Sequence, residues 1–334
     1  MKVLLLGPTG QLGYDICRAH AEAGEPFELV PIGRDLLDVA AKGETERFLG
    51  ALSFDAIINC TSFHNTDEVE DNAALAFAVN AHGVQTLAGI CAAKHARLIH
   101  VSTDYVFGGN AVRDRPLGEE DPIAPVNVYG ASKALGETLA QLACKDVAIL
   151  RVASLFGVAG ASGKGGNFVE TMVRVGRGKG MLRVVEDQIM SPTATADIAR
   201  VMLRILIEGC QPGIYHVVNS GAASWFEFAR EIVRRTGIAA SVAPCTTAEY
   251  PTRAARPHYS VLDNAKIVRA FGPMPTWQEA LERYLSARGY LMGDSDPGGD
   301  GAPNDIFHVC RPLHPDDDGG GTPAAARYDR ERSV

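Results

Sequence analysis

The chain has 334 residues, 46% of them hydrophobic, which is enough for one large domain or two coupled ones. Its formal net charge of −8 argues against a general nucleic-acid binder, and no apolar run reaches the roughly 20 residues that span a membrane. The seven cysteines are odd in number and never spaced as Cys-x-x-Cys, so neither a disulfide framework nor a zinc site is expected. The apolar start of the chain is too short for a signal peptide, and we expect a reduced, cytoplasmic protein.

A glycine-rich turn follows the first predicted strand. Residues 2 to 7 form a continuous apolar run that ends in glycine, and a helical pattern begins at Gln11. Gly7, Gly10 and Gly13 allow a tight turn, close approach of the backbone to a pyrophosphate, and close packing of the helix on the sheet. Their spacing differs from the commoner Gly-x-Gly-x-x-Gly, so the general fingerprint fits only approximately. The position between a strand and a helix favours a dinucleotide-binding loop over an ordinary glycine-rich loop.

The residues after the second predicted strand, 28 to 32, bear on the choice of cofactor. An acidic residue at this place binds the adenosine ribose in dinucleotide folds, whereas an arginine accommodates a 2′-phosphate. Arg34 therefore favours NADPH, although the neighbouring Asp35 leaves NADH open as well. Asp38 and Val39 are expected near the adenine.

The third predicted strand, 55 to 59, leads into a candidate cofactor wall. Thr61, Ser62 and Phe63 lie at its carboxyl end, where open α/β sheets bind their ligands. The acidic residues 67 to 71 are interpreted as the solvated start of a helix rather than a metal site, because carboxylates are favoured at a helix N-terminus. No metal site is predicted.

The candidate catalytic residues lie further along the chain. Tyr129 and Lys133 are four apart, so a helix would present them on one face. We expect the lysine ammonium to bring the tyrosine pKa down toward the working range, so that Tyr129 can protonate a carbonyl oxygen. Thr103 follows the fourth strand, 97 to 101, and would be a second hydrogen-bond donor. The alternatives are a solvated helix face and a hydroxyl that only caps a turn.

Strands and helices alternate with the rhythm of βαβ units, with a long crossover helix at 73 to 95, and this predicts a parallel sheet. Helices at 166 to 179 and 195 to 208 are expected to return to the dinucleotide domain. A strand at 214 to 218 is expected to begin a smaller domain.

The predicted fold class is therefore α/β, a Rossmann-type doubly wound parallel sheet with a smaller C-terminal substrate domain. Residues 1–150 with 166–210 would bind NAD(P), and residues 151–165 with 211–290 would bind substrate. Residues 291–334 are rich in Gly, Pro and Asp, and a disordered tail is expected there.

Three motifs resemble those of a known family: the glycines from Gly7, the segment Ser102 to Phe107, and the segment Asn127 to Lys133. They are similar to extended short-chain dehydrogenases/reductases, and within these to the dTDP-4-dehydrorhamnose reductase family. The resemblance covers about residues 1 to 290. It implies that Tyr129 is the catalytic acid and that Lys133 holds the nicotinamide ribose. It also implies that Thr103 and Asp104 contact the sugar near its 4-keto group, and that cofactor is bound by Gly10, Gln11, Leu12, Asp38, Val39, Thr61, Ser62 and Phe63.

The substrate side is less well defined. Arg253 and Arg256 are candidates to meet the nucleotide diphosphate, because guanidinium groups suit phosphate. Ser154 stands where the family usually has a tryptophan that lines the sugar pocket, and this leaves the exact sugar open. Some family members dimerise through a magnesium ion held by glutamates, which cannot be placed in this sequence; a homodimer is left open.

The leading hypothesis is reduction of a nucleotide-linked 4-keto-deoxysugar, dTDP-4-dehydro-L-rhamnose above others, by hydride from NAD(P)H. A dehydratase is disfavoured because Asp104 is followed by Tyr105 and not by a glutamate. Two alternatives stay open. A 4-epimerase would use the same tyrosine and lysine with a tightly held NAD, and a regulatory subunit resembling that of methionine adenosyltransferase would not turn over substrate.

Overall fold

A computed structural model of the chain describes residues 1–109, 115–160 and 166–292. Its main body is a parallel sheet of six strands in the order β2-β1-β3-β4-β5-β10, which confirms the predicted fold class. Alternate residues of the interior strand β1 face opposite sides: Val3 and Leu5 enter one core, and Leu4 and Leu6 the other. Pro31 lies in the edge strand, where its missing N–H is tolerated. The strands are β1 (Lys2–Leu6), β2 (Glu28–Ile32), β3 (Ala56–Asn59), β4 (Arg97–Thr103), β5 (Val147–Val152) and β10 (Gly213–His216).

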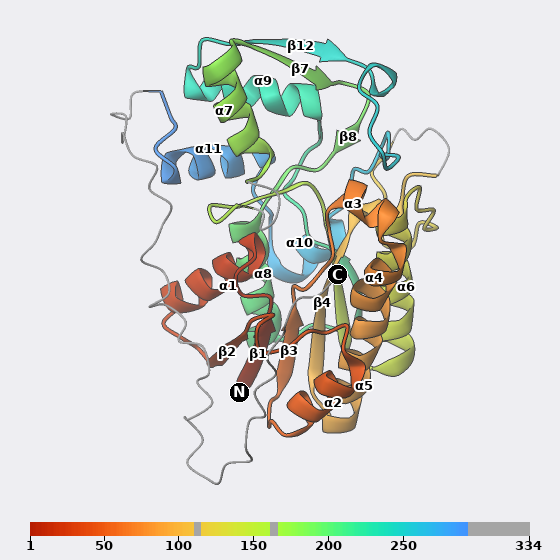
Figure 1. Ribbon diagram of the computed structural model, residues 1–334. Helices are drawn as coiled ribbons and strands as arrows, with labels where there is room; N and C mark the ends of the chain where they lie inside the picture. Colours follow the sequence, from red (N-terminus) through yellow and green to blue (C-terminus); the bar gives the residue numbers. More distant parts are fainter. Residues whose placement is uncertain (110–114, 161–165, 293–334) are drawn as a thin grey trace, which may run out of the picture.

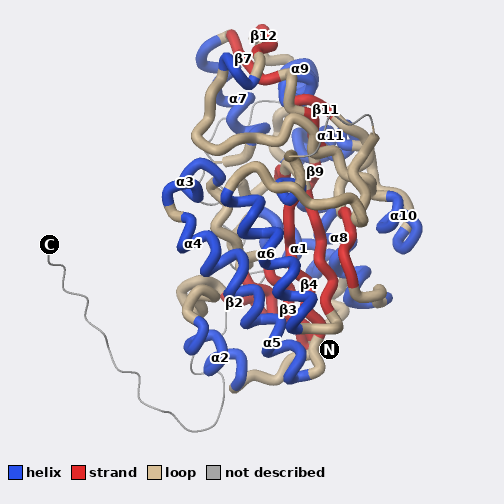
Figure 2. Tube along the Cα trace, turned by 90° about the vertical axis from the view of Figure 1, so that its right-hand side faces the viewer, coloured by secondary structure: helices blue, strands red, loops and turns tan. Residues whose placement is uncertain are grey.

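Helices cover both faces of this sheet (Figures 1 and 2). Each contributes a stripe of buried apolar side chains, such as Ile16 and Met202 on one face and Leu49 and Leu87 on the other. The first face carries α1 (Gln11–Glu22), α8 (Thr195–Glu208) and α10 (Ala265–Phe271), and the second carries α2 (Lys42–Gly50), α5 (Val84–Lys94) and α6 (Val128–Ala143).

The crossover helix is interrupted by a π-helical turn. It runs as α4 (Ala73–Phe77), η1 (Ala78–Gly83) and then α5, so the predicted helix is present but not uniform. By length and composition the run Ala73–Lys94 could cross a membrane. In this fold Val84, Leu87 and Cys91 are instead buried against the sheet, as expected of a core helix.

A smaller part stands over the carboxyl ends of the strands (Figure 1). Its own core includes Val169, Phe228, Trp277 and Leu281. It consists of α7 (Phe168–Lys179), β7 (Met181–Val185), α9 (Trp225–Thr236), β12 (Ser241–Cys245) and α11 (Trp277–Ala287), together with the short pairs β6 (Leu155–Phe156) with β9 (Thr193–Ala194) and β8 (Ile189–Met190) with β11 (Ala223–Ser224).

Two predicted assignments to the dinucleotide and substrate domains are wrong. The strand expected to open the smaller domain, β10, pairs with β5 and extends the main sheet. The helix at 166 to 179, α7, does not return to the sheet, because Val169, Met172 and Val173 pack in the core of the smaller part. The pattern of apolar residues in an element predicts its type, but it does not show which surface will cover its buried side. Of the predicted tail, 291–334, all but the first two residues lie outside the described part of the chain.

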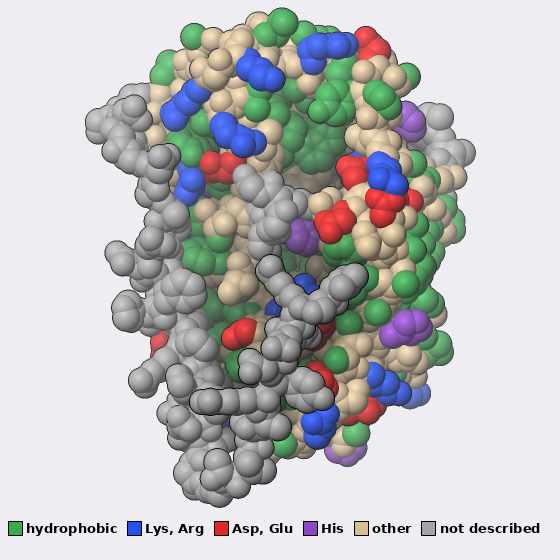
Figure 3. All heavy atoms as spheres, viewed as in Figure 1, with side chains coloured by type: hydrophobic (Ala, Val, Ile, Leu, Met, Phe, Trp, Pro, Cys, Tyr) green, Lys and Arg blue, Asp and Glu red, His purple; other side chains and the backbone are tan. Residues whose placement is uncertain are grey.

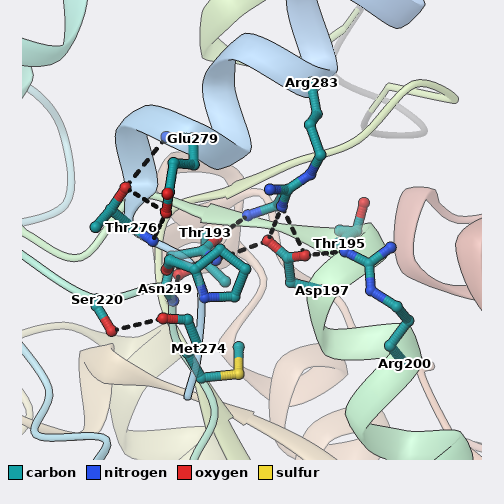
Figure 4. Close-up of polar contacts among 12 residues, drawn as sticks. Thr193, Thr195, Asp197, Arg200, Asn219, Ser220, Met274, Thr276, Glu279 and Arg283 are labelled. Carbon is teal, nitrogen blue, oxygen red and sulfur yellow. Dashed lines mark hydrogen bonds and ion pairs between the residues drawn. The ribbon is translucent and has the colours of Figure 1, made fainter.

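The two parts are joined by a buried carboxylate on α8. Asp197 is 2% exposed, and its oxygens accept hydrogen bonds from Arg283 Nη2 on α11 at 2.8 and 2.7 Å and from Asn219 Nδ2 at 2.7 Å (Figure 4). Arg200, one turn along α8, also pairs with Asp197. Because a buried charge is tolerated only with such partners, this contact holds α11 against the main body.

Candidate active site

The glycine turn between β1 and α1 has the geometry that its residues require. Gly7 has a φ of +79°, which favours glycine. A Cβ at Gly13 would collide with the carbonyl of Gly7 and lie 2.8 Å from Cα of Pro8, so the helix can approach the turn only with glycine there. The first amides of α1 therefore open directly onto the end of the sheet. Gln11 Oε1 is buried and has no hydrogen-bond partner within the described residues.

The segment after β2 brings Arg34 and Asp38 together. Arg34 Nη2 lies 3.6 Å from Asp38 Oδ2, and the arginine side chain is 81% exposed. Asp38 Oδ1 also accepts a hydrogen bond from the amide of Ala40 at 3.0 Å. Such an exposed pair contributes little stability, so the guanidinium can exchange its partner for a phosphate at small cost. Val39 is buried, and its carbonyl lies against Gly83.

The candidate cofactor wall is held in place by Asn80, which sequence reasoning missed. Its Oδ1 accepts hydrogen bonds from the Ser62 hydroxyl at 3.1 Å and the Phe63 amide at 2.9 Å. Its Nδ2 donates to the Phe63 carbonyl at 2.9 Å and to Ser132 Oγ, on α6, at 3.0 Å. Asn80 is fully buried in the π-helical turn, and π-turns are frequent at functional sites. The available signal was a single polar side chain in the otherwise apolar run from residue 73 to residue 81.

Close packing positions the helix that carries Tyr129. Asn127 caps α6 by accepting a hydrogen bond from the Gly130 amide at 2.8 Å. A Cβ at Gly130 would collide with the carbonyl of Tyr105, so this glycine lets α6 approach the end of β4. Tyr105 and Tyr129 meet edge to face with ring centroids 5.8 Å apart.

The Tyr129 hydroxyl is brought to Thr103 and Ser62. Burial raises the pKa of Tyr129 to about 12, and hydrogen bonds with Thr103 and Ser62 act in the opposite direction. The sequence predicted a tyrosine pKa lowered by Lys133, and this is wrong here because burial dominates. A neutral phenol with hydroxyl partners is a proton donor, not a standing phenolate.

Lys133 is 1% exposed and lies beneath the site. Its Nζ donates a hydrogen bond to the Val101 carbonyl at 2.6 Å and lies 3.3 Å from His100 Nε2. Burial lowers the pKa of Lys133 to about 8, while Glu137 and Cys60 act to raise it. Lys133 therefore changes charge close to neutral pH.

Asp104 supports the hydroxyl of Thr103. Thr103 Oγ1 donates to Asp104 Oδ1 at 3.1 Å and accepts a hydrogen bond from the Tyr105 amide at 3.2 Å. Ser260 donates to Asp104 Oδ2 at 2.6 Å. Burial raises the pKa of Asp104 to about 6, against the effect of hydrogen bonds from Ser260 and Thr103.

The two arginines expected at the diphosphate are paired with the acidic helix α3 (Thr66–Asp71). Arg256 Nη2 lies 2.7 Å from Asp67 Oδ2, and Arg253 pairs with Asp71. The acidic run starts a helix as expected, and its side chains stay partly exposed to solvent: Asp67 and Asp71 are 44% and 43% exposed although they pair with these arginines. Nη1 of Arg256 is buried and has no hydrogen-bond partner among the described residues.

The remaining predicted substrate residue, Ser154, follows β5 with a φ of +45°, a strained value for a residue other than glycine. Its carbonyl accepts a hydrogen bond from the Thr193 amide at 3.3 Å. The surface is hollowed between the two parts, with hydrophobic side chains above and acidic side chains on one side (Figure 3). Within residues 1–109, 115–160 and 166–292, no group of three or more His, Cys, Asp or Glu side chains is placed to hold a metal ion.

These positions define a class of protein. A parallel dinucleotide fold that carries Thr103 at the end of β4, and Tyr129 and Lys133 one turn apart on α6, is that of an extended short-chain dehydrogenase/reductase.

Comparison with known proteins narrows the class. The family model described as RmlD substrate binding domain matches residues 1–289. The spore coat polysaccharide biosynthesis protein SpsK of Bacillus subtilis is 38% identical over 86% of this chain and 98% of its own. The dTDP-4-dehydrorhamnose reductase of Mycolicibacterium smegmatis is 36% identical over 86% of this chain and 85% of its own.

A solved structure agrees. The dTDP-4-dehydrorhamnose reductase of Bacillus anthracis, in complex with NADP, has a TM-score of 0.78 and 35% identity, covering 86% of this chain and 100% of that chain. The chain therefore belongs to the dTDP-4-dehydrorhamnose reductase family, which the RmlD substrate binding domain represents.

Proposed function

We propose that this protein reduces the 4-keto group of dTDP-4-dehydro-L-rhamnose to the hydroxyl of dTDP-L-rhamnose, with NADPH as the preferred cofactor. The observation that carries the proposal is the Tyr129 hydroxyl, held with Thr103 and Ser62 above Lys133 where β3 and β4 end. The printed activity of the Mycolicibacterium smegmatis relative supports the substrate, and the NADP bound in the Bacillus anthracis structure supports the cofactor.

The residues present fit the dinucleotide. Gly7, Gly10 and Gly13 leave the backbone open to a pyrophosphate. Gln11 Oε1 beside them is buried, has no partner in the part of the chain that the structure describes, and is suited to a ligand donor. Arg34 would hold the 2′-phosphate, and we assign the remaining contacts to Leu12, Asp38, Val39, Thr61, Ser62 and Phe63. NADPH, when bound, would supply the hydride.

The protein supplies the proton and its placement. As the carbonyl carbon gains the hydride, Tyr129 gives its proton to the carbonyl oxygen, and the product is the C4 hydroxyl with a tyrosinate left behind. Thr103, whose hydroxyl donates to Asp104 Oδ1 in this structure, would turn that O–H to the same carbonyl oxygen when substrate binds. The charge of Lys133 would stabilise the tyrosinate and hold the nicotinamide ribose. We assign binding of the diphosphate to Arg253 and Arg256. To bind it, the two arginines would have to break their ion pairs with carboxylates of α3.

The test follows NADPH and NADH absorbance with dTDP-4-dehydro-L-rhamnose generated in situ. We expect the wild type to oxidise NADPH faster than NADH, and Tyr129→Phe to lose at least ~10²-fold in kcat. Tyr215→Phe is the matched control, because that hydroxyl bonds the Gln211 carbonyl far from the site. A wild type that is silent with both cofactors would contradict the reductase. Copurified NAD with 4-epimerase turnover would then favour an epimerase, and copurification with a synthetase would favour a regulatory subunit.

A further inference from the structure

Three fully buried polar side chains form a chain beneath the catalytic tyrosine. Asn59 ends β3, His100 lies within β4, and Lys133 lies on α6; their exposures are 0%, 0% and 1%. Asn59 Nδ2 lies 3.1 Å from His100 Nδ1, and His100 Nε2 lies 3.3 Å from Lys133 Nζ. The proposed reaction uses Lys133 and gives no role to Asn59 or His100.

The orientation of the Asn59 amide is determined by its other neighbour. Asn59 Oδ1 accepts hydrogen bonds from the Thr61 amide at 3.0 Å and from the Thr61 hydroxyl at 2.6 Å. A backbone N–H can only donate, so the oxygen must face Thr61 and the NH₂ group must face His100.

That orientation determines the histidine tautomer. His100 Nδ1 faces a donor and must accept, so in the neutral ring the proton resides on Nε2. The Nε2–H group then points at Lys133 Nζ. An ammonium has three N–H groups and no lone pair, so it cannot accept from Nε2–H, whereas a neutral amine can.

The other groups around Lys133 only partly oppose the preference of His100 Nε2–H for a neutral amine. The Val101 carbonyl accepts from Nζ in either protonation state. Glu137, one turn further on α6, favours the ammonium, but Arg151 pairs with it at 2.7 Å. Cys60, at the end of β3, also favours the ammonium.

We propose that Asn59 and His100 are positioning residues that favour the neutral amine of Lys133 through this hydrogen-bond chain, and so set the pH above which the enzyme loses activity. The proposal rests on the proposed reductase function, in which the Lys133 charge stabilises the tyrosinate. Burial by itself lowers the pKa of Lys133 to about 8, and the hydrogen-bond chain acts in the same direction.

The main test replaces the ring by an amide of similar reach. In His100→Gln the amide oxygen can take the place of Nε2 and accept from the ammonium, so the alkaline limb of the kcat/KM profile should move up by about 1 pH unit or more. Asn59→Asp gives the same direction by another route, because a carboxylate accepts from Nδ1–H and leaves Nε2 free to accept from Lys133. If Asn59→Asp acts through the ring, it should add little in the His100→Gln background.

A second readout needs no turnover. The ¹³Cε resonance of lysine reports its charge, and the Lys133 signal is identified by its loss in Lys133→Arg. We expect that signal to titrate near pH 8 in the wild type, and at higher pH in His100→Gln and in Asn59→Asp. His20→Gln is the matched control, since His20 is buried, bonds the Phe27 carbonyl at 2.7 Å and lies outside the site.

The outcomes are distinct. A fall in kcat with an unmoved alkaline limb and an unmoved Lys133 titration would reduce Asn59 and His100 to structural roles and overturn the proposal. If the wild type does not reduce the sugar, the proposed function fails, and the NMR titration alone decides whether the hydrogen-bond chain controls Lys133.

Discussion

Ser260 Oγ donates a hydrogen bond of 2.6 Å to Asp104 Oδ2, across 156 residues of chain. The bond joins the loop of the smaller part to the end of β4, where Asp104 also orients the Thr103 hydroxyl. Both groups are buried, so the contact forms only once the smaller part is seated on the sheet. The position of the Thr103 hydroxyl thus depends on the packing of both parts of the molecule.

The first prediction concerns stability and pH. The folded pKa of Asp104, about 6, lies above the ordinary carboxyl value, so the folded state binds the proton more tightly than the unfolded state. The stability that the protonated Asp104 carboxyl gives the folded state is present at low pH, and it is lost as pH rises from about 4 to about 6. Asp104→Asn, which cannot ionise, should therefore gain in unfolding free energy relative to wild type over that window, by on the order of 1–3 kcal/mol. Urea unfolding at pH 4 and pH 7 measures it, and a difference that is constant with pH would contradict the raised pKa.

Ser260→Ala should raise the pKa of the Asp104 carboxyl, which Asp104→Asn removes altogether. Loss of the serine hydroxyl removes a hydrogen bond that favours the carboxylate, so the pKa of Asp104 should rise further above 6. The acidic limb of kcat/KM should move to higher pH, because the Asp104 carboxylate that holds Thr103 in place before substrate binds is then protonated at a higher pH. Ser241→Ala, at an exposed position on β12, is the control and should leave the limb in place.

Asn80→Ala tests the support of the cofactor wall. The substitution removes the hydrogen-bond partner of the Ser62 hydroxyl, the Phe63 amide and Ser132 Oγ inside the protein. We therefore expect a loss of about 2–4 kcal/mol in stability, together with weaker NADPH binding. Asn72→Ala, at the exposed residue immediately before α4, should cost below about 0.5 kcal/mol. Chemical unfolding and NADPH fluorescence titration provide the two readouts. Equal effects of the two variants would argue against the support role.

Gly13→Ala tests the dinucleotide loop. The added methyl group would collide with the Gly7 carbonyl, so the turn must shift and NADPH affinity should fall by about 10-fold or more. Gly89→Ala on α5 meets nothing within 4 Å and should leave binding intact while stabilising the helix by about 0.5–1 kcal/mol. The comparison separates a local collision from a general effect of replacing glycine.

Arg34→Ala tests cofactor preference. If Arg34 meets the 2′-phosphate, the Kd for NADPH should rise by about 10-fold and that for NADH should hardly change. Lys42→Ala, at a similarly exposed cation on α2, is the control. A parallel loss for both cofactors would place Arg34 elsewhere in the site.

The local sequence pattern was enough to predict the glycine turn and the helix that carries Tyr129 and Lys133. The glycines from Gly7 to Gly13 lie between a strand and a helix, and Tyr129 and Lys133 lie one turn apart; both arrangements are properties of consecutive residues. Thr103 comes at the end of a predicted strand, and this local position was enough to predict that it lies at the carboxyl edge of the sheet. Short-range periodicity determines which side of an element is buried, and parallel strands bring their carboxyl ends to one edge.

The tertiary structure decided everything that depends on a distant partner. It placed β10 beside β5 and α7 against α9, because an apolar face can be covered by any complementary surface. It brought Asn80 to Ser62, and Arg256 to Asp67, across long stretches of chain. It also raised the pKa of Tyr129 rather than lowering it, because burial depends on every element packed around a group and not on the one charge that a helical spacing suggests.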